Sequence, residues 1–254
     1  MNPASKPIAS PEPASTTVLV RDSAEGALEL FLTGRPLTME FAPGQHVFPG
    51  GRIEPGDGRP EILGRLQGFD PAEAARLVSC GEIPAGAFWV GAIRELFEEA
   101  GLLLALERGA PLAPERIAEL DRAWRLEVQQ GRTGFAQLLE QFDLALSAPR
   151  LRFFDHWCTP EGRPRRFDTR FFLTVLEEPI ELVHTPGEAV SSLWVRPADA
   201  LDAARQGRIG LMPPTRRTIE RLSRYRTVEE LLGGYSSDEF ARDLERRRGQ
   251  PAVG

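Results

Sequence analysis

The feature that most constrains this chain is a run of eight residues, 94–101, which reads Arg-Glu-Leu-Phe-Glu-Glu-Ala-Gly. Its acids Glu95, Glu98 and Glu99 are spaced i, i+3 and i+4, so on a helix their carboxylates share one face. The opposite face carries the apolar residues Ile93, Leu96, Phe97 and Ala100. The pattern therefore predicts an amphipathic helix over residues 85–100 that buries its apolar face in a core.

The three glutamates allow two interpretations. One is an acidic stripe on a solvated helix, but such a stripe usually carries lysine four residues from each acid, and this run contains no lysine. The other is a metal site, because clustered carboxylates without basic partners suit hard divalent cations such as Mg²⁺. The loop that precedes the helix in the sequence favours the metal site.

That loop, residues 48–57, contains the pair Gly50-Gly51 between Pro49 and Pro55. Adjacent glycines let the backbone approach a ligand closely, and the prolines stiffen the loop. Together, loop and helix resemble the signature of the Nudix hydrolase family, G-x5-E-x7-R-E-U-x-E-E-x-G-U, in which U is aliphatic. Gly51 matches the first glycine. The second half matches at each defined position, namely Arg94, Glu95, Leu96, Glu98, Glu99, Gly101 and Leu102.

The chain departs from this signature in two ways. Asp57 stands in place of the first glutamate, and 37 positions separate it from Arg94 where the signature has eight, an excess of 29. A coincidental match would explain this, and so would a family branch with an insertion, here residues 58–86. The chain is similar to such a branch, which includes a mammalian peroxisomal coenzyme A diphosphatase. The similarity lies in residues 30–35, 46–51, 165–169 and 194–201.

The resemblance implies an α/β fold: the Nudix α/β/α sandwich with a mixed sheet, an insertion in the signature and extra helices. We expect a disordered leader over residues 1–14, a Nudix domain over 15–210 and a helical C-terminal extension over 211–248. Strand patterns cover 16–21, 27–33, 47–48, 102–106, 151–159, 166–176 and 189–195, and helical patterns cover 71–79, 114–130 and 135–142. The capped helix of the insertion predicts that this segment packs and lines the substrate cleft.

The resemblance also implies an activity: hydrolysis of a nucleoside diphosphate linked to another moiety, with Mg²⁺ or Mn²⁺ as cofactor. The leading expectation is cleavage of coenzyme A or acyl-coenzyme A to adenosine 3′,5′-bisphosphate and a phosphopantetheine. Hydrolysis of ADP-ribose, dinucleotides or nucleotide sugars is a second reading. A non-catalytic module that binds a nucleotide to regulate a partner is a third, against which the intact acidic set argues.

The resemblance assigns candidate site residues in three groups. The metal ligands are Gly51, through its carbonyl oxygen, with Glu95, Glu98 and Glu99. The catalytic set adds Arg94, which orients a carboxylate, and a late acid for which Glu188 is the first candidate and Glu181 the alternative. Candidate phosphate-binding residues are Arg35, Gly50, Arg166 and Arg170, because guanidinium forks and glycine-rich backbone match phosphate oxygens.

Composition limits the partners. The net charge of −6 argues against nucleic acid as a partner and leaves a small-molecule nucleotide as the expected one. The longest apolar runs are far shorter than the roughly 18 residues that a membrane helix needs. Cys80 and Cys158 are the two cysteines, which favours a reducing cytoplasm over a disulfide framework. The sequence leaves a homodimer open.

Overall fold

The computed structural model describes residues 9–40, 42–78, 81–131, 134–177, 180–182, 184 and 189–235. Its main sheet has eight strands in the order β12-β3-β2-β1-β10-β9, with β4 also paired to β1 and β11 to β2. The strand β1 (Glu12–Asp22) runs parallel to β10 (Phe167–Val175) and antiparallel to β2 (Leu28–Gly34) and β4 (Gly50–Arg52). The other strands are β3 (Gln45–Val47), β9 (Arg152–Cys158), β11 (Ser191–Val195) and β12 (Gly210–Leu211).

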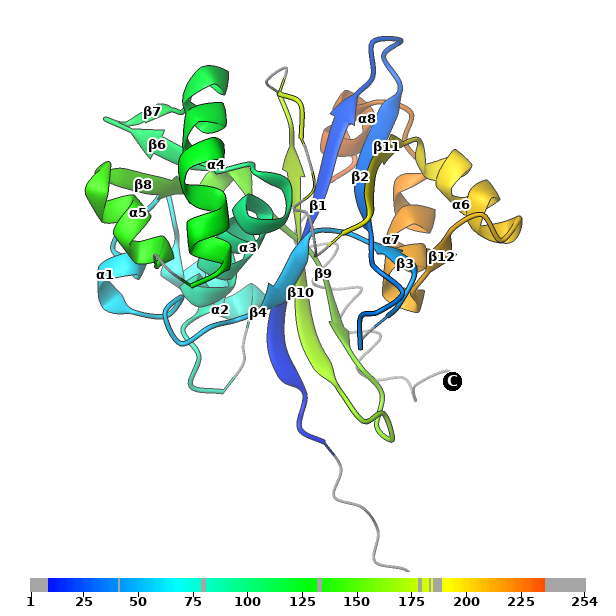
Figure 1. Ribbon diagram of the computed structural model, residues 1–254, viewed down its shortest axis with the longest axis horizontal. Helices are drawn as coiled ribbons and strands as arrows, with labels where there is room; N and C mark the ends of the chain where they lie inside the picture. The colour runs from blue at the N-terminus through cyan, green and yellow to red at the C-terminus, as the bar shows by residue number, and fades with distance from the viewer. Residues whose placement is uncertain are drawn as a thin grey trace, which may run out of the picture.

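Helices cover both faces of this sheet, and Figure 1 shows the two groups on either side of β1 and β10. One face carries α3 (Ala85–Ala100), α4 (Pro114–Gln129) and α5 (Phe135–Gln141), and the other carries α6 (Pro197–Arg205), α7 (Pro213–Leu222) and α8 (Val228–Gly233). The alternation of β1 divides its side chains between the two layers: Leu19 packs in the cluster of α3, while Val18 and Val20 pack with α6, α7 and α8. The expected α/β/α sandwich with a mixed sheet is confirmed.

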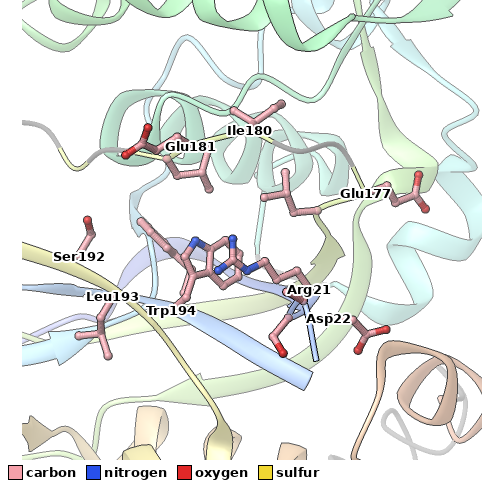
Figure 2. A pocket seen from close by; sticks show the side chains of 13 residues that line it. Arg21, Asp22, Glu177, Ile180, Glu181, Ser192, Leu193 and Trp194 are labelled. Atoms are coloured by element: carbon pink, nitrogen blue, oxygen red, sulfur yellow. The ribbon is translucent and has the colours of Figure 1, made fainter. Parts of the chain in front are cut away.

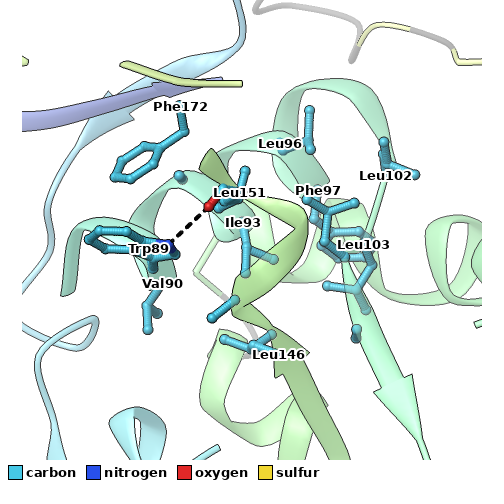
Figure 3. Packing of buried hydrophobic residues seen from close by; sticks show 14 of the residues in the cluster. Trp89, Val90, Ile93, Leu96, Phe97, Leu102, Leu103, Leu146, Leu151 and Phe172 are labelled. Atoms are coloured by element: carbon cyan, nitrogen blue, oxygen red, sulfur yellow. Dashed lines mark hydrogen bonds between the residues drawn. The ribbon is translucent and has the colours of Figure 1, made fainter. Parts of the chain in front are cut away.

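The helix α3 has the bounds that its sequence predicts. Ile93, Leu96 and Phe97 are fully buried, and Figure 3 shows them beside Leu103 and Leu146 in the larger core cluster. Each such side chain contributes about 1.5–3 kcal/mol when it leaves water. Gly101 ends the helix in the left-handed conformation, with φ 74° and its N–H bonded to the Phe97 carbonyl. The burial of one face fixes the rotation of α3, and with it the direction of the glutamates.

The described residues of the insertion, 58–78 and 81–86, pack against the first half of α3. They contain α1 (Pro60–Leu63), β5 (Leu66–Gln67) and α2 (Pro71–Leu77), the last capped by the Asp70 carboxylate on two backbone N–H groups, as its sequence predicts. The ring of Phe69 packs edge-on against Trp89 of α3, with centroids 5.3 Å apart. The strand β5 joins a second sheet, ordered β5-β8-β6-β7 and made with β8 (Leu144–Ser147), β6 (Ala105–Glu107) and β7 (Ala110–Pro111).

Three local expectations need correction. β1 begins at Glu12, so residues 12–14, expected in a disordered leader, pair with β10 instead. Leu102–Leu104 are fully buried but precede the strand, which begins at Ala105, because an apolar run reports burial and not strand pairing. The helical pattern from residue 213 divides into α7 and α8, and its continuation beyond 235 lies outside the described residues. None of the described helices has the length and apolarity to span a bilayer.

Candidate active site

The centre of the candidate site is a buried ion pair between the helix and the loop. The guanidinium of Arg94 donates to both oxygens of Asp57, over 2.9 and 3.0 Å, and to the carbonyl oxygen of Arg52 over 2.9 Å. Asp57 also accepts from the backbone N–H of Glu54 at 2.8 Å. Arg94 and Asp57 are each 3% exposed. The shorter acid thus ties the loop to α3 across the insertion, as a bidentate pair can.

Arg94 also contacts the acidic face of its own helix. Its Nη1 lies 2.8 Å from Glu95 Oε1 and 3.3 Å from Glu98 Oε1. Burial alone lowers the pKa of Arg94, but the hydrogen bond to Asp57 and the charges of Glu95, Asp57 and Glu98 outweigh it and raise the pKa above its usual value. Arg94 therefore stays charged and holds two signature carboxylates in fixed positions.

The glycine pair brings the backbone against the same carboxylates. The N–H of Gly50 donates to Glu99 Oε2 over 3.2 Å. A Cβ on Gly51 would lie 2.5 Å from Glu95 Oε1, so a side chain at this position would displace that carboxylate. Gly50 and Gly51 are held by β4, which pairs with Thr16 and Ser15 of β1. Close backbone approach explains why this position needs glycine.

The donor set fits a divalent cation of the Mg²⁺ type. Glu95, Glu98 and the Gly51 carbonyl offer the hard oxygen ligands that such ions prefer. In the described part of the chain, no three acid, histidine or cysteine side chains form a ready-made metal cage. Mg²⁺ does not need one, because it keeps several waters and is usually held by one or two carboxylates together with substrate phosphates.

Comparisons with known proteins identify the family of this chain. The family described as the NUDT19 Nudix domain matches residues 8–222. The chain belongs to the Nudix family. It is 31% identical to the human protein named acyl-coenzyme A diphosphatase NUDT19 over 239 residues, which cover 82% of this chain and 64% of that protein. The match to the chicken protein of the same name is 32% identical and covers 86% and 67%.

A solved Nudix structure supports the fold directly. The Nudix hydrolase from Alicyclobacillus acidocaldarius superposes with a TM-score of 0.69 at 30% identity, and the match covers 89% of this chain and 97% of that one. The interrupted signature is therefore a Nudix signature with an insertion, and the coincidental match is excluded. The chain spans just under two thirds of the human relative, so that relative's activity and substrates enter only as a proposal.

A cavity of about 810 Å³ lies on the α3 face of the Nudix sheet, between β2, β11 and the segment that follows β10. Figure 2 shows Trp194 and Arg21 on the sheet side, with Ile180 and Glu181 across from them. Glu181, the alternative late acid, therefore lines a space open to a ligand. Glu188, the first candidate, lies outside the described residues.

The three candidate arginines lie in different settings. Arg35 directly follows β2, and its backbone N–H donates to Gln45. Arg166 donates to the carbonyl oxygens of Ala9 and Thr159. Arg170 is 2% exposed, and its Nη1 lies 2.6 Å from Asp168 Oδ2. Arg170 is thus enclosed and paired in this structure, and its expected role in binding substrate phosphate stays a prediction.

Sequence reasoning missed two groups of residues around the site. The first group is Asp168, which contacts both Arg170 and His156 Nε2. The spacing of these three residues in the sequence does not indicate an ion-pair network. Arg21 lies over the Trp194 ring, 4.1 Å from its centroid, although 173 positions separate them. The pairing of β11 with β2 creates that contact. The sequence motif at residues 194–201 pointed to the family, but it did not predict that Trp194 lines a cavity.

The insertion does not line this cavity. The cavity's lining comes from residues 21–24, 31, 176, 177, 180–182 and 192–194. That residues 58–86 wall the substrate cleft stays a prediction. The apolar side chains of the insertion Ile62, Leu66 and Leu77 are buried in the core cluster.

Proposed function

We propose that this chain is a metal-dependent pyrophosphohydrolase that cleaves coenzyme A or acyl-coenzyme A to adenosine 3′,5′-bisphosphate and the corresponding phosphopantetheine. The observation that carries the proposal is the Arg94 cluster, in which one buried guanidinium holds Asp57, Glu95 and Glu98 against the glycine loop. The names of the human and chicken relatives support the coenzyme A substrate. The proposed partner is thus a small-molecule nucleotide, and the proposed compartment is the cytoplasm. A homodimer stays a prediction.

The cofactor that fits the donor set is Mg²⁺ or Mn²⁺, in a family that generally uses divalent metals. When bound, such an ion withdraws charge from the pyrophosphate and lowers the pKa of a coordinated water. Glu95, Glu98, Glu99 and the Gly51 carbonyl would hold it. Arg94 does not reach the substrate, since its guanidinium is enclosed; it positions Glu95 and Glu98.

The hydrolysis needs water to attack one phosphorus while the bridging oxygen leaves with the other phosphate. A general base near the attacked phosphorus accelerates this step by taking the proton of the water. Glu188 is our candidate for that base or for an additional ligand, and Glu181 is the alternative because it lines the cavity. If Glu188 has this role, Glu188→Gln should lower kcat more than it raises KM. An effect of that kind in Glu181→Gln alone would transfer the role to Glu181.

Product analysis tests the proposal as a whole. The full chain is incubated with coenzyme A, acyl-coenzyme A, ADP-ribose, a dinucleotide and a nucleotide sugar, each with Mg²⁺, with Mn²⁺ and with excess chelator. We expect adenosine 3′,5′-bisphosphate from the coenzyme A compounds, and no product when the metal is removed. Turnover of ADP-ribose or the other nucleotides in preference to coenzyme A would support the second reading. Nucleotide binding without turnover would support the non-catalytic module.

A further inference from the structure

Two buried hydroxyl groups of β1 contact the helix that carries the signature glutamates. Ser15 and Thr17 are both fully buried. Ser15 Oγ donates to the carbonyl oxygen of Phe88 over 2.8 Å, and Thr17 Oγ1 donates to that of Ala92 over 3.3 Å. Both carbonyls belong to α3. These hydrogen bonds therefore join the side chains of β1 directly to the backbone of α3.

The spacing of these contacts follows from the geometry of the two elements. The hydroxyls lie two residues apart on a strand, a distance of about 6.6–6.8 Å, and the carbonyls lie four residues apart on a helix, a distance of about 6.0 Å. Each carbonyl oxygen has two lone pairs, so it can accept the hydroxyl in addition to its helical N–H. Hydrogen bonds are directional and apolar packing is not, so these two bonds restrict the movement of α3 along β1.

The same stretch of β1 also holds the glycine pair. The backbone of Ser15 pairs with Gly51, and that of Thr16 pairs with Gly50. This part of β1 thus contacts β4 through its backbone and α3 through its hydroxyls. The position of the glycine loop relative to the helix is therefore set from one short segment of strand.

The candidate ligands depend on that relative position. The N–H of Gly50 donates to Glu99 Oε2 over 3.2 Å, and a Cβ on Gly51 would lie 2.5 Å from Glu95 Oε1. Glu95 and Glu99 are one helical turn apart, so a movement of α3 along β1 changes both contacts together. A shift of one residue would move each carboxylate about 1.5 Å along the helix axis and turn it away from the loop.

We propose that Ser15 and Thr17 are positioning residues of the active site, whose hydroxyls fix α3 on β1 so that Glu95 and Glu99 meet the glycine loop. This inference rests on the proposed function. Both hydroxyls are enclosed between the strand and the helix, so they act through α3 and not on the substrate.

The test removes the hydroxyls and measures metal binding as well as turnover. In Ser15→Ala/Thr17→Val, the Kd for Mn²⁺, measured by electron paramagnetic resonance on the full chain without substrate, should rise about tenfold through loss of the two bonds. The kcat for coenzyme A should fall by a similar factor with little change in KM, because the substrate contacts remain. Thr17→Ser keeps the hydroxyl and should keep the Mn²⁺ affinity and the kcat of the parent.

Thr174→Val is the matched control. Thr174 lies on β10, opposite Leu19 of β1, and is 2% exposed. Its hydroxyl has no hydrogen-bond partner in the described part of the chain. The same chemical change at this buried strand position breaks no bond to α3, so the variant should keep the Mn²⁺ affinity and the kcat of the parent.

Each other outcome has a defined meaning. Unchanged Mn²⁺ affinity in a folded double variant overturns the positioning role, and so does an equal loss in Thr17→Ser and Thr17→Val, which would assign the effect to packing. If the double variant does not fold, Thr17→Val alone replaces it, with an expected rise of about threefold in the Kd for Mn²⁺. A parent chain that binds no Mn²⁺ would overturn the metal assignment and this inference with it.

Failure of the proposed substrate gives a different result. A parent chain that binds Mn²⁺ but hydrolyses no coenzyme A compound would overturn the proposed function, while the comparison of Mn²⁺ affinities would still decide the role of Ser15 and Thr17.

Discussion

Two buried arginines on the α3 side of the sheet both contact carboxylates. They differ in the balance of acidic and basic groups around them. Arg94, on α3, touches three carboxylates, those of Asp57, Glu95 and Glu98. Arg170, on β10, contacts the carboxylate of Asp168, which also contacts His156, and the Arg170 guanidinium lies over the Phe88 ring at 4.7 Å. The two arginines are 3% and 2% exposed, so burial does not separate them.

The charge balance does separate them. Around Arg94, the carboxylates outnumber the guanidinium that holds them, which leaves negative charge that a divalent cation can neutralise. Around Asp168, basic groups lie on both oxygens, so an added cation has little to bind. We infer that the first cluster is built for a ligand and the second for structure. Burial of an arginine is therefore weak evidence for function unless the charges around it are counted.

The largest expected effect is on turnover in the first cluster. Glu98→Gln and Glu99→Gln remove ligand charge without loss of volume, and each should lower kcat/KM with Mg²⁺ by about a hundredfold or more while the melting temperature stays close to that of the parent. Glu119→Gln, an acid-to-amide change at an exposed position of α4, is the control and should retain activity. Near-normal activity of both signature variants at limiting Mg²⁺ would contradict the metal assignment.

The next effect concerns stability. Asp57→Asn leaves Arg94 with Glu95 and Glu98 but without its bidentate partner, which should cost about 1.5–3 kcal/mol in the free energy of unfolding. Activity should fall as well, because the pair between Asp57 and Arg94 no longer connects the loop to α3. Urea denaturation followed by circular dichroism measures the free energy of unfolding. Product formation by the remaining folded protein measures the activity. A fully stable Asp57→Asn would show that the pair does not hold the site together.

A change in the second cluster, formed by Asp168, Arg170 and His156, should alter the free energy of unfolding and not the turnover. The size of this effect should depend on pH. Burial raises the pKa of Asp168, but the hydrogen bonds from His156 and Arg170 outweigh it and hold the pKa well below its usual value. A depressed pKa contributes stability that is present above the unfolded value, about 3.9, and is lost as the pH falls through the folded pKa. Asp168→Asn should therefore cost about 1–3 kcal/mol at pH 7, and this difference should shrink below about pH 4.

Urea denaturation of both proteins at pH 7 and at pH 3 checks this prediction. Turnover by Asp168→Asn at neutral pH should stay close to that of the parent. A large loss of turnover in a variant that remains folded would place the second cluster in the active site and remove the distinction between the two.

The smallest expected effect is at Gly51. An added methyl group would meet the Glu95 carboxylate at 2.5 Å, and because that group ends a flexible side chain, it can move aside at little cost in stability. Gly51→Ala should then lower kcat/KM about tenfold through the displaced ligand. Gly56→Ala in the same loop has no atom within 4 Å of the new methyl and should be silent. Equal activity of the two variants would remove Glu95 from the site.

Much of the site was predictable because it is local. The spacing of Glu95, Glu98 and Glu99 depends only on the helical period, and the apolar residues between them set which way that face turns. The same holds for the Asp70 cap and for Gly101, which act within one turn of a helix. These features need no knowledge of the rest of the chain.

The sequence by itself determined the family, the sandwich architecture and the acidic face of α3, since motif and periodicity are properties of neighbouring residues. Only the tertiary structure decided which arginine is enclosed, that Asp57 reaches Arg94 across the insertion, and that Arg21 meets Trp194 in a cavity with an acidic balance. Those contacts join residues far apart in the chain. They depend on strand register and on which side of the sheet each segment packs. The pattern of neighbouring residues determines neither of these.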